Sequence, residues 1–106
     1  MTKLNYLLEC LAEECAEVQH IKSKIIRFGM EDMHPTTEVI NRHQLVGELH
    51  DLLAVIELIM EEDQVLKTLV NTGKYEHIEH KKKKIEKYMQ YSKTKVLKHE
   101  NTNTNI

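Results

Sequence analysis

Five acidic residues stand in two short groups whose spacing suits the binding of a cation. Glu13, Glu14 and Glu17 lie in the segment AEECAEVQ (12–19), and Glu48 and Asp51 begin and end the segment ELHD. Residues three apart on an α-helix share one face, so Glu14 pairs with Glu17 and Glu48 pairs with Asp51. Each pair borders a stripe of apolar residues. The pattern predicts two helices that each carry a carboxylate pair beside a packing surface.

Packing these two apolar stripes together would bring four carboxylates into one place. At about 6 Å and an effective dielectric constant near 20, each pair of carboxylates repels by roughly 3 kcal/mol. Several such repulsion energies together are comparable to the total free energy of unfolding of a small domain, roughly 5–15 kcal/mol. We therefore expect a bound cation to compensate the repulsion. Carboxylate oxygens without thiolates or paired imidazoles suit Mg²⁺ or Mn²⁺. A single E-x-x-E pair is typical of a solvated helix face, whereas a second pair on another helix favours a metal site.

Apolar residues at steps of three and four predict a first helix over residues 3–28, and Gly29 should end it. Residues 29–41 contain the only proline and have no clean period, which predicts a loop with at most one helical turn. Gly47 costs about 1 kcal/mol relative to alanine inside a helix. With Ala54 it indicates either a close helix crossing or room for a substrate.

The second helix is predicted over about 42–61, and Asn41 with Gln44 resembles the capping box that begins a helix. Its later part, LLAVIELIM, is apolar on nearly every face, so we expect it to be buried all round. Two further helices are expected, a short one over about 63–71 and a last one over about 75–92.

Composition favours one small all-α domain. The chain has 106 residues, of which 41% are hydrophobic, with only three glycines and one proline. We expect this domain to occupy residues 1–92, followed by a polar, disordered tail over 93–106. The net charge of −2 gives no reason to expect nucleic-acid binding. No stretch reads as a signal peptide or a membrane span, so we expect a soluble, cytoplasmic protein that does not bind membranes.

The two acidic groups and the segments around them resemble those of a known family. The two acidic groups fit E-E-x-x-E and E-x-x-D, the paired motifs of the MazG-like all-alpha nucleoside triphosphate pyrophosphohydrolases. That group also includes dCTP pyrophosphatases and phosphoribosyl-ATP pyrophosphohydrolase. LAEECAEVQHIKSKIIRFG and ELHDLLAVIELI are similar to the first two helices of the small MazG-like proteins of phages and bacteria, and KKKKIEKYMQYS is similar to their last. The resemblance covers about residues 4–92.

The resemblance implies a four-helix bundle and a Mg²⁺- or Mn²⁺-dependent enzyme. Its substrate would be a nucleoside triphosphate, cleaved between the α and β phosphates to give a monophosphate and pyrophosphate. The metal ligands implied are Glu14, Glu17, Glu48 and Asp51. Three roles stay open for Glu13, which points about 100° away from Glu14. It binds an additional metal, orients the attacking water, or faces solvent.

Binding of a triphosphate also requires positively charged side chains, and the first and last predicted helices contain them. Lys24 lies on the stripe of the ligands, about 10 Å along the axis from Glu17, and Arg27 lies nearby. The last predicted helix adds a shared face that includes Lys81, Lys84 and Tyr88. The resemblance places Lys81 and Lys84 where related proteins carry lysines, although a charge run of this kind is also typical of a solvated face. We regard all five residues as candidates for substrate binding.

Two departures from the family and one alternative function stay open. The loop over 29–41 is longer than in compact members, so it is either a lid or an insertion. The chain has no tryptophan, which some related enzymes use to hold the base, so base preference does not transfer. A non-catalytic, oligomeric scaffold or nucleotide- or metal-binding module is the alternative. Because 52–60 is apolar around its circumference, we expect a homodimer or a dimer of dimers.

Overall fold

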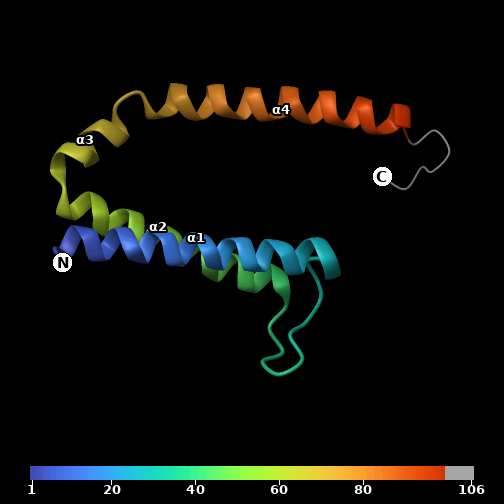
Figure 1. Cartoon of the computed structure of the whole chain (residues 1–106), viewed down its shortest axis with the longest axis horizontal. Coiled ribbons are helices and arrows are strands. Elements are labelled where there is room, and N and C mark those ends of the chain that lie inside the picture. The colour runs from blue at the N-terminus through green and yellow to red at the C-terminus, as the bar shows by residue number, and fades with distance from the viewer. Residues whose placement is uncertain (100–106) are drawn as a thin grey trace. The chain divides into compact units, whose positions relative to one another are not determined.

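The computed structural model describes residues 1–99, with side chains through residue 93. This part of the chain contains four helices: α1 (Lys3–Phe28), α2 (Asn41–Glu62), α3 (Gln64–Asn71) and α4 (Lys74–His99) (Figure 1). The predicted all-α class is confirmed for the described residues. The chain divides into two compact units, the first spanning Met1–Lys67 and the second beginning at Thr68.

The helix boundaries agree with the predicted ones to within one residue, apart from the end of α4. This helix continues to His99, beyond the predicted end at about residue 92. No glycine or proline follows it to stop the helix, which explains why its end was misjudged. The remainder of the predicted tail, residues 100–106, lies outside the described residues. The division into a domain and a tail stays a prediction.

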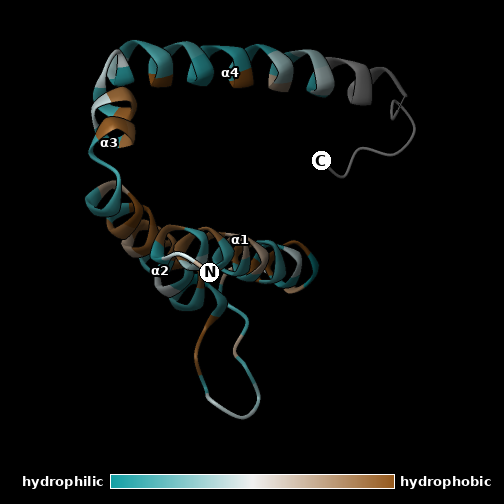
Figure 2. Ribbon diagram, turned by 60° about the vertical axis from the view of Figure 1, so that its left-hand side comes forward, coloured by the Kyte–Doolittle hydropathy of each residue, from teal (hydrophilic) through white to brown (hydrophobic). Residues whose placement is uncertain are grey.

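α1 and α2 pack side by side as an antiparallel hairpin (Figure 1). Leu7 and Ile21 of α1 and Ile59 of α2 are buried between them. In Figure 2, hydrophobic and hydrophilic residues alternate along α1 and α2. Each buried leucine or isoleucine stabilises the fold by roughly 1.5–3 kcal/mol. An ion pair of 3.5 Å between Lys3 Nζ and a carboxylate oxygen of Glu62 joins the hairpin at its open end.

α1 has a stabilising group at each end. The Thr2 side chain accepts the backbone N–H of Asn5 at 3.0 Å, which satisfies one of the unpaired donors of the first turn. Gly29 has a φ of 93° and donates its backbone N–H to the Ile25 carbonyl at 2.7 Å. The prediction that Gly29 ends this helix is confirmed.

The predicted capping box at the start of α2 is wrong. Ile40 is the N-cap residue and makes no side-chain cap. Asn41 lies one residue further on, is buried, and donates its Nδ2–H to the Gly29 carbonyl at 3.0 Å. Gln44 instead accepts a hydrogen bond from Lys24. Both polar side chains are therefore used to join α2 to the preceding part of the chain.

The connection between α1 and α2 is an irregular loop with the single helical turn that was predicted, in which the backbone N–H of Glu38 donates to the His34 carbonyl at 2.9 Å (Figure 1). An isolated antiparallel bridge closes its base. At its tip, His34 Nδ1 accepts the backbone N–H groups of Thr36 and Thr37 at 3.1 and 3.2 Å. Arg42 donates to Glu31 Oε1 from Nη2 at 2.6 Å and from Nε at 2.9 Å. The loop is thus held by its own hydrogen bonds.

Two expectations about α2 are not met within one chain. The exposed fractions of Leu49, Leu53 and Leu58 are 42%, 55% and 45%, so this helix is not buried all round. A methyl group added at Gly47 would meet nothing within 4 Å, so no close helix crossing occurs there in the described part of the chain. The hairpin covers only one side of α2.

The second unit contains the second half of α3 and the whole of α4. Gly73, with a φ of 64°, separates the two helices. α4 is largely hydrophilic in Figure 2. Its apolar residues Ile78, Ile85 and Met89 are exposed. Among the described residues, no helix combines the length and the apolar character needed to cross a membrane.

Candidate metal centre

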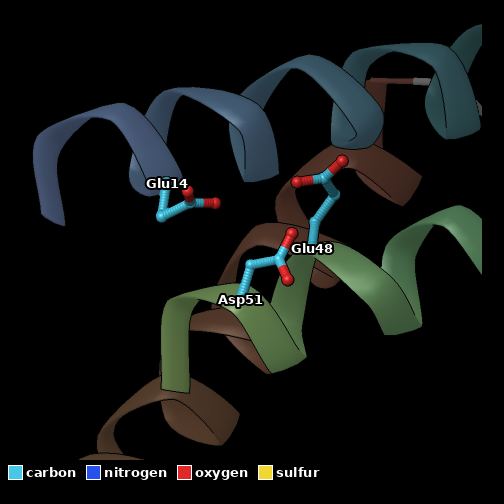
Figure 3. A group of neighbouring side chains, drawn as sticks. All are labelled: Glu14, Glu48 and Asp51. Atoms are coloured by element: carbon cyan, nitrogen blue, oxygen red, sulfur yellow. The ribbon is translucent and has the colours of Figure 1, made fainter. Parts of the chain in front are cut away.

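Three of the predicted ligands come together between α1 and α2. Glu14 extends from α1, and Glu48 and Asp51 extend from successive turns of α2 toward it (Figure 3). Each offers one carboxylate oxygen, and these three oxygens all lie within 4.8 Å of one another. Glu14 and Glu48 are half-buried, whereas Asp51 is exposed. The site is therefore open to solvent on the side of Asp51.

The core of the hairpin positions these carboxylates. Glu14 lies midway between the buried residues Leu7 and Ile21, seven residues from each, and so occupies the packing face of α1. On α2, Glu48 precedes half-buried Leu52 by four residues and thus lies one turn along the same face. Burial of the apolar neighbours fixes where the two carboxylates point. The packing of the hydrophobic core therefore determines where these two carboxylates lie relative to each other.

The acidic cluster, defined as Glu14, Glu48 and Asp51, has an unfavourable charge distribution. Partial burial is the largest cause that raises the pKa of the Glu14 carboxyl above its ordinary value. The negative charges of Asp51, Glu48, Glu17 and Glu13 raise this pKa further, in that order. None of the ion pairs among the described side chains involves the cluster. A bound cation would relieve this repulsion.

The donor set fits a hard divalent cation. It offers carboxylate oxygens alone, which Mg²⁺ and Mn²⁺ accept, and neither thiolate nor imidazole among the described residues belongs to it. Three protein carboxylates leave room for water or phosphate oxygens in the octahedral shell that Mg²⁺ prefers. The cluster therefore has the composition of a candidate site for a hard divalent cation whose remaining ligands would come from outside the cluster.

Glu17 and Glu13 lie on the same helix as Glu14 but outside the group of three close oxygens. Both side chains are exposed. Their charges still contribute to the raised pKa of Glu14, so they shape the electrostatics of the cluster. A ligand role for Glu17 and the three alternatives for Glu13 stay predictions.

The two predicted cations of α1 have different surroundings. Lys24 is half-buried and its Nζ donates to Gln44 Oε1 at 3.1 Å. Arg27 is exposed, with its guanidinium carbon 5.9 Å from the ring centre of Phe28. The sequence analysis did not predict the contact of Gln44 with Lys24 because Gln44 was assigned to a capping box. The available signal was its position four residues before Glu48, on the same face of the helix.

The predicted substrate-binding residues of α4 belong to the second unit and are described by themselves. Lys81, Lys84 and Tyr88 are all exposed. Two of these residues, Lys84 and Tyr88, line a shallow surface hollow of about 450 Å³. The other described residues that line it are His80, Lys83 and Lys87. This basic hollow has the charge to accept an anion, and its role in substrate binding stays a prediction.

Comparison of the chain with protein-family models, with curated proteins and with solved structures gave no match.

Proposed function

We propose that the chain is a Mg²⁺-dependent nucleoside triphosphate pyrophosphohydrolase of the MazG-like type. The observation that carries this proposal is the convergence of Glu14, Glu48 and Asp51, with three carboxylate oxygens within 4.8 Å of one another. The resemblance of the two acidic motifs to those of the family supplies the reaction. Mn²⁺ is the second ion that this donor set suits.

In the proposed reaction, a water oxygen forms a bond to the α phosphorus while the bond from that phosphorus to the α–β bridging oxygen breaks. The products are a nucleoside monophosphate and pyrophosphate. The divalent ion, when bound, neutralises phosphate charge and favours ionisation of the water. Glu14, Glu48 and Asp51 hold the ion, with Glu17 as the fourth proposed ligand. One open role for Glu13 is to accept a hydrogen bond from the attacking water.

Cationic side chains would bind the rest of the triphosphate. Lys24 and Arg27 come from the same helix as Glu14 and Glu17. On α4, the proposed contacts are Lys81, Lys84 and Tyr88, with Tyr88 assigned to the base or ribose. The hollow lined by Lys84 and Tyr88 supports the proposal that this helix binds an anion.

We further propose that the enzyme is a homodimer or a dimer of dimers. At 100° per residue, one flank of α2 carries the exposed residues Val46, Leu49 and Leu53. The matching flank of α1 carries exposed Leu8 and Cys15. Asp51, the exposed member of the acidic cluster, lies about 160° from Leu53 around α2, so the open side of the cluster faces away from the apolar flank. A second copy that packs here would leave the carboxylates accessible.

The products of the reaction test the proposed function. Nucleoside triphosphates incubated with the protein and Mg²⁺ should yield pyrophosphate and monophosphate in equal amounts. Because changes beyond the first ligands of a metal site cost roughly 10–100-fold, Glu48→Gln should lower the rate by more than about a hundredfold. Glu57→Gln, on the same helix and exposed, is the matched control and should keep the wild-type rate.

Other products would contradict the proposal in recognisable ways. Inorganic phosphate with a nucleoside diphosphate would place cleavage at the γ phosphate. No product from any ribo- or deoxynucleoside triphosphate would favour the non-catalytic scaffold. Retention of activity by Glu48→Gln would remove the acidic cluster from the mechanism.

A further inference from the structure

One contact between the two helices of the hairpin has no part in the core. Lys24 Nζ of α1 donates to Gln44 Oε1 of α2 at 3.1 Å, and both side chains are half-buried. Gln44 precedes Glu48 by four residues, which is one helical turn or about 6 Å along α2. The contact therefore lies on the flank of the acidic cluster, next to it along the hairpin.

The hydrogen-bond partner of Lys24 carries no charge of its own. Gln44 is neutral, and no ion pair among the described side chains includes Lys24. Three other cations of the described chain, in contrast, each pair with a carboxylate: Lys3, Arg42 and Lys82. An amide oxygen fixes the direction of an ammonium group without cancelling its charge. A half-buried, oriented cation of this kind favours an anion from solution.

We propose that Gln44 is a positioning residue that holds the Lys24 ammonium as the subsite for the terminal phosphate of a nucleoside triphosphate. This inference rests on the proposed function, in which the α and β phosphates lie at the acidic cluster. The γ phosphate is then the next charged group along the substrate, and Lys24 is the cation that follows the cluster along the hairpin. The pair thereby selects triphosphates over diphosphates.

The same pair sets the direction in which the substrate lies. Ribose and base carry no charge, so only the phosphate end of a nucleotide gains from contact with an ammonium group. The terminal phosphate therefore points toward Lys24 and Gln44, and the nucleoside points along the hairpin in the opposite direction, toward Asp51.

Two substitutions separate charge from shape at this subsite. Gln44→Glu keeps the side-chain size and supplies a carboxylate that pairs with Lys24 and cancels its charge. Lys24→Met keeps the aliphatic stem and removes the ammonium. Lys24→Arg restores the charge and should rescue the function in part. Lys22→Met is the matched control because Lys22 is exposed on the other flank of the same helix.

Thermal melting with inorganic polyphosphates measures the subsite without turnover. In Mg²⁺, tripolyphosphate should raise the melting temperature of the wild type more than pyrophosphate does. Gln44→Glu and Lys24→Met should lose this difference, whereas Lys22→Met should keep it. Equal effects of the two polyphosphates on the wild type, or an unchanged difference in Gln44→Glu, would overturn the inference. Circular dichroism of each variant verifies that it is folded.

Kinetics then test selection between nucleotides. Because a hydrogen bond to a charged group contributes roughly 1.5–3 kcal/mol, the preference in kcat/KM for a triphosphate over the matching diphosphate should fall about tenfold or more in Gln44→Glu. The loss should appear mainly in KM, and an equal loss for both nucleotides would contradict the subsite. If the wild type releases no pyrophosphate from any triphosphate, the proposed function fails, while the melting experiment still decides whether the anion subsite exists.

Discussion

Glu14 occupies a position on the packing face of α1 where a hydrophobic residue would stabilise the hairpin. Its neighbours at seven residues on either side, Leu7 and Ile21, are both buried. A carboxylate at this place lowers the stability of the metal-free fold, as its raised pKa indicates. A cation bound at this place would offset the repulsion between the carboxylates and recover the lost stability.

The first prediction concerns Glu14 and pH in the absence of metal. Because the folded protein binds the Glu14 proton more tightly than the unfolded chain, the fold loses stability as pH rises from the ordinary value of 4.5 through the raised pKa. Glu14→Gln should therefore melt at a higher temperature than the wild type at pH 7 in EDTA. The two proteins should converge below pH 4.5. A lower melting temperature for Glu14→Gln at pH 7 would contradict the repulsion.

The second prediction concerns metal and the same carboxylates. A ligand at a hundred times its Kd stabilises a protein by about 2.7 kcal/mol, which in a domain of this size raises Tm by on the order of 10 °C. Saturating Mg²⁺ or Mn²⁺ should have this effect on the wild type, and Asp51→Asn should lose most of it. Glu17→Gln tests the ligand that lies outside the close group. Equal shifts in the wild type and Asp51→Asn would exclude this cluster as the site.

At the scale of single elements, two glycines provide a matched pair for the third prediction. Gly29 has φ 93° and ψ 164°, a region that is essentially restricted to glycine. Gly29→Ala should destabilise the hairpin by roughly 1–3 kcal/mol, measured by urea unfolding. Gly47→Ala lies inside α2, where the added methyl meets nothing within 4 Å, and should stabilise by about 0.5–1 kcal/mol. A loss of stability in Gly47→Ala would indicate that another molecule packs at this position.

Helices and their boundaries were largely predictable because apolar periodicity and breaker residues are local signals. The period of three and four placed α1, and Gly29 ended it as expected. Asn41 and Gln44 were misassigned because a capping box and a pair of tertiary contacts have the same sequence pattern. Which of the two forms depends on the register between α1 and α2, and that register is set by packing across the loop.

The acidic cluster was predictable only in part for the same reason. Spacing alone placed Glu48 and Asp51 on one face of a helix, and the apolar stripes indicated that Glu14 would face them. Glu17 satisfies the same i, i+3 rule yet lies outside the close group: the helix turns it about 60° away from half-buried Glu14, and its side chain is exposed. A one-dimensional pattern cannot distinguish these two positions relative to a neighbouring helix.

The whole molecule leaves many apolar side chains in contact with solvent. Only Leu7, Ile21 and Ile59 are buried hydrophobic residues among those described, whereas Leu53 has an exposed fraction of 55%. So small a core gives limited stability, since each buried leucine or isoleucine contributes only roughly 1.5–3 kcal/mol. Association through the apolar flank of the hairpin would supply the missing burial.

The fourth prediction tests this association. Light scattering at micromolar concentration should give a mass of at least twice the 12.5 kDa of one chain. Leu53→Glu places a charge on the apolar flank and should dissociate the assembly and inactivate it. Ala54→Glu adds the same charge to an exposed position on the other side of α2 and should preserve the mass. A fully active wild-type monomer would contradict the proposed dimer.

The loop between α1 and α2 depends on one side chain for the order of its tip. His34 Nδ1 accepts two backbone N–H groups, from Thr36 and Thr37, so a single nitrogen satisfies two amides of the loop. Removing this acceptor should therefore expose both amides together while α1 and α2 stay intact. Hydrogen exchange would detect this local opening in His34→Ala as a loss of protection at Thr36 and Thr37, with unchanged protection in the two helices.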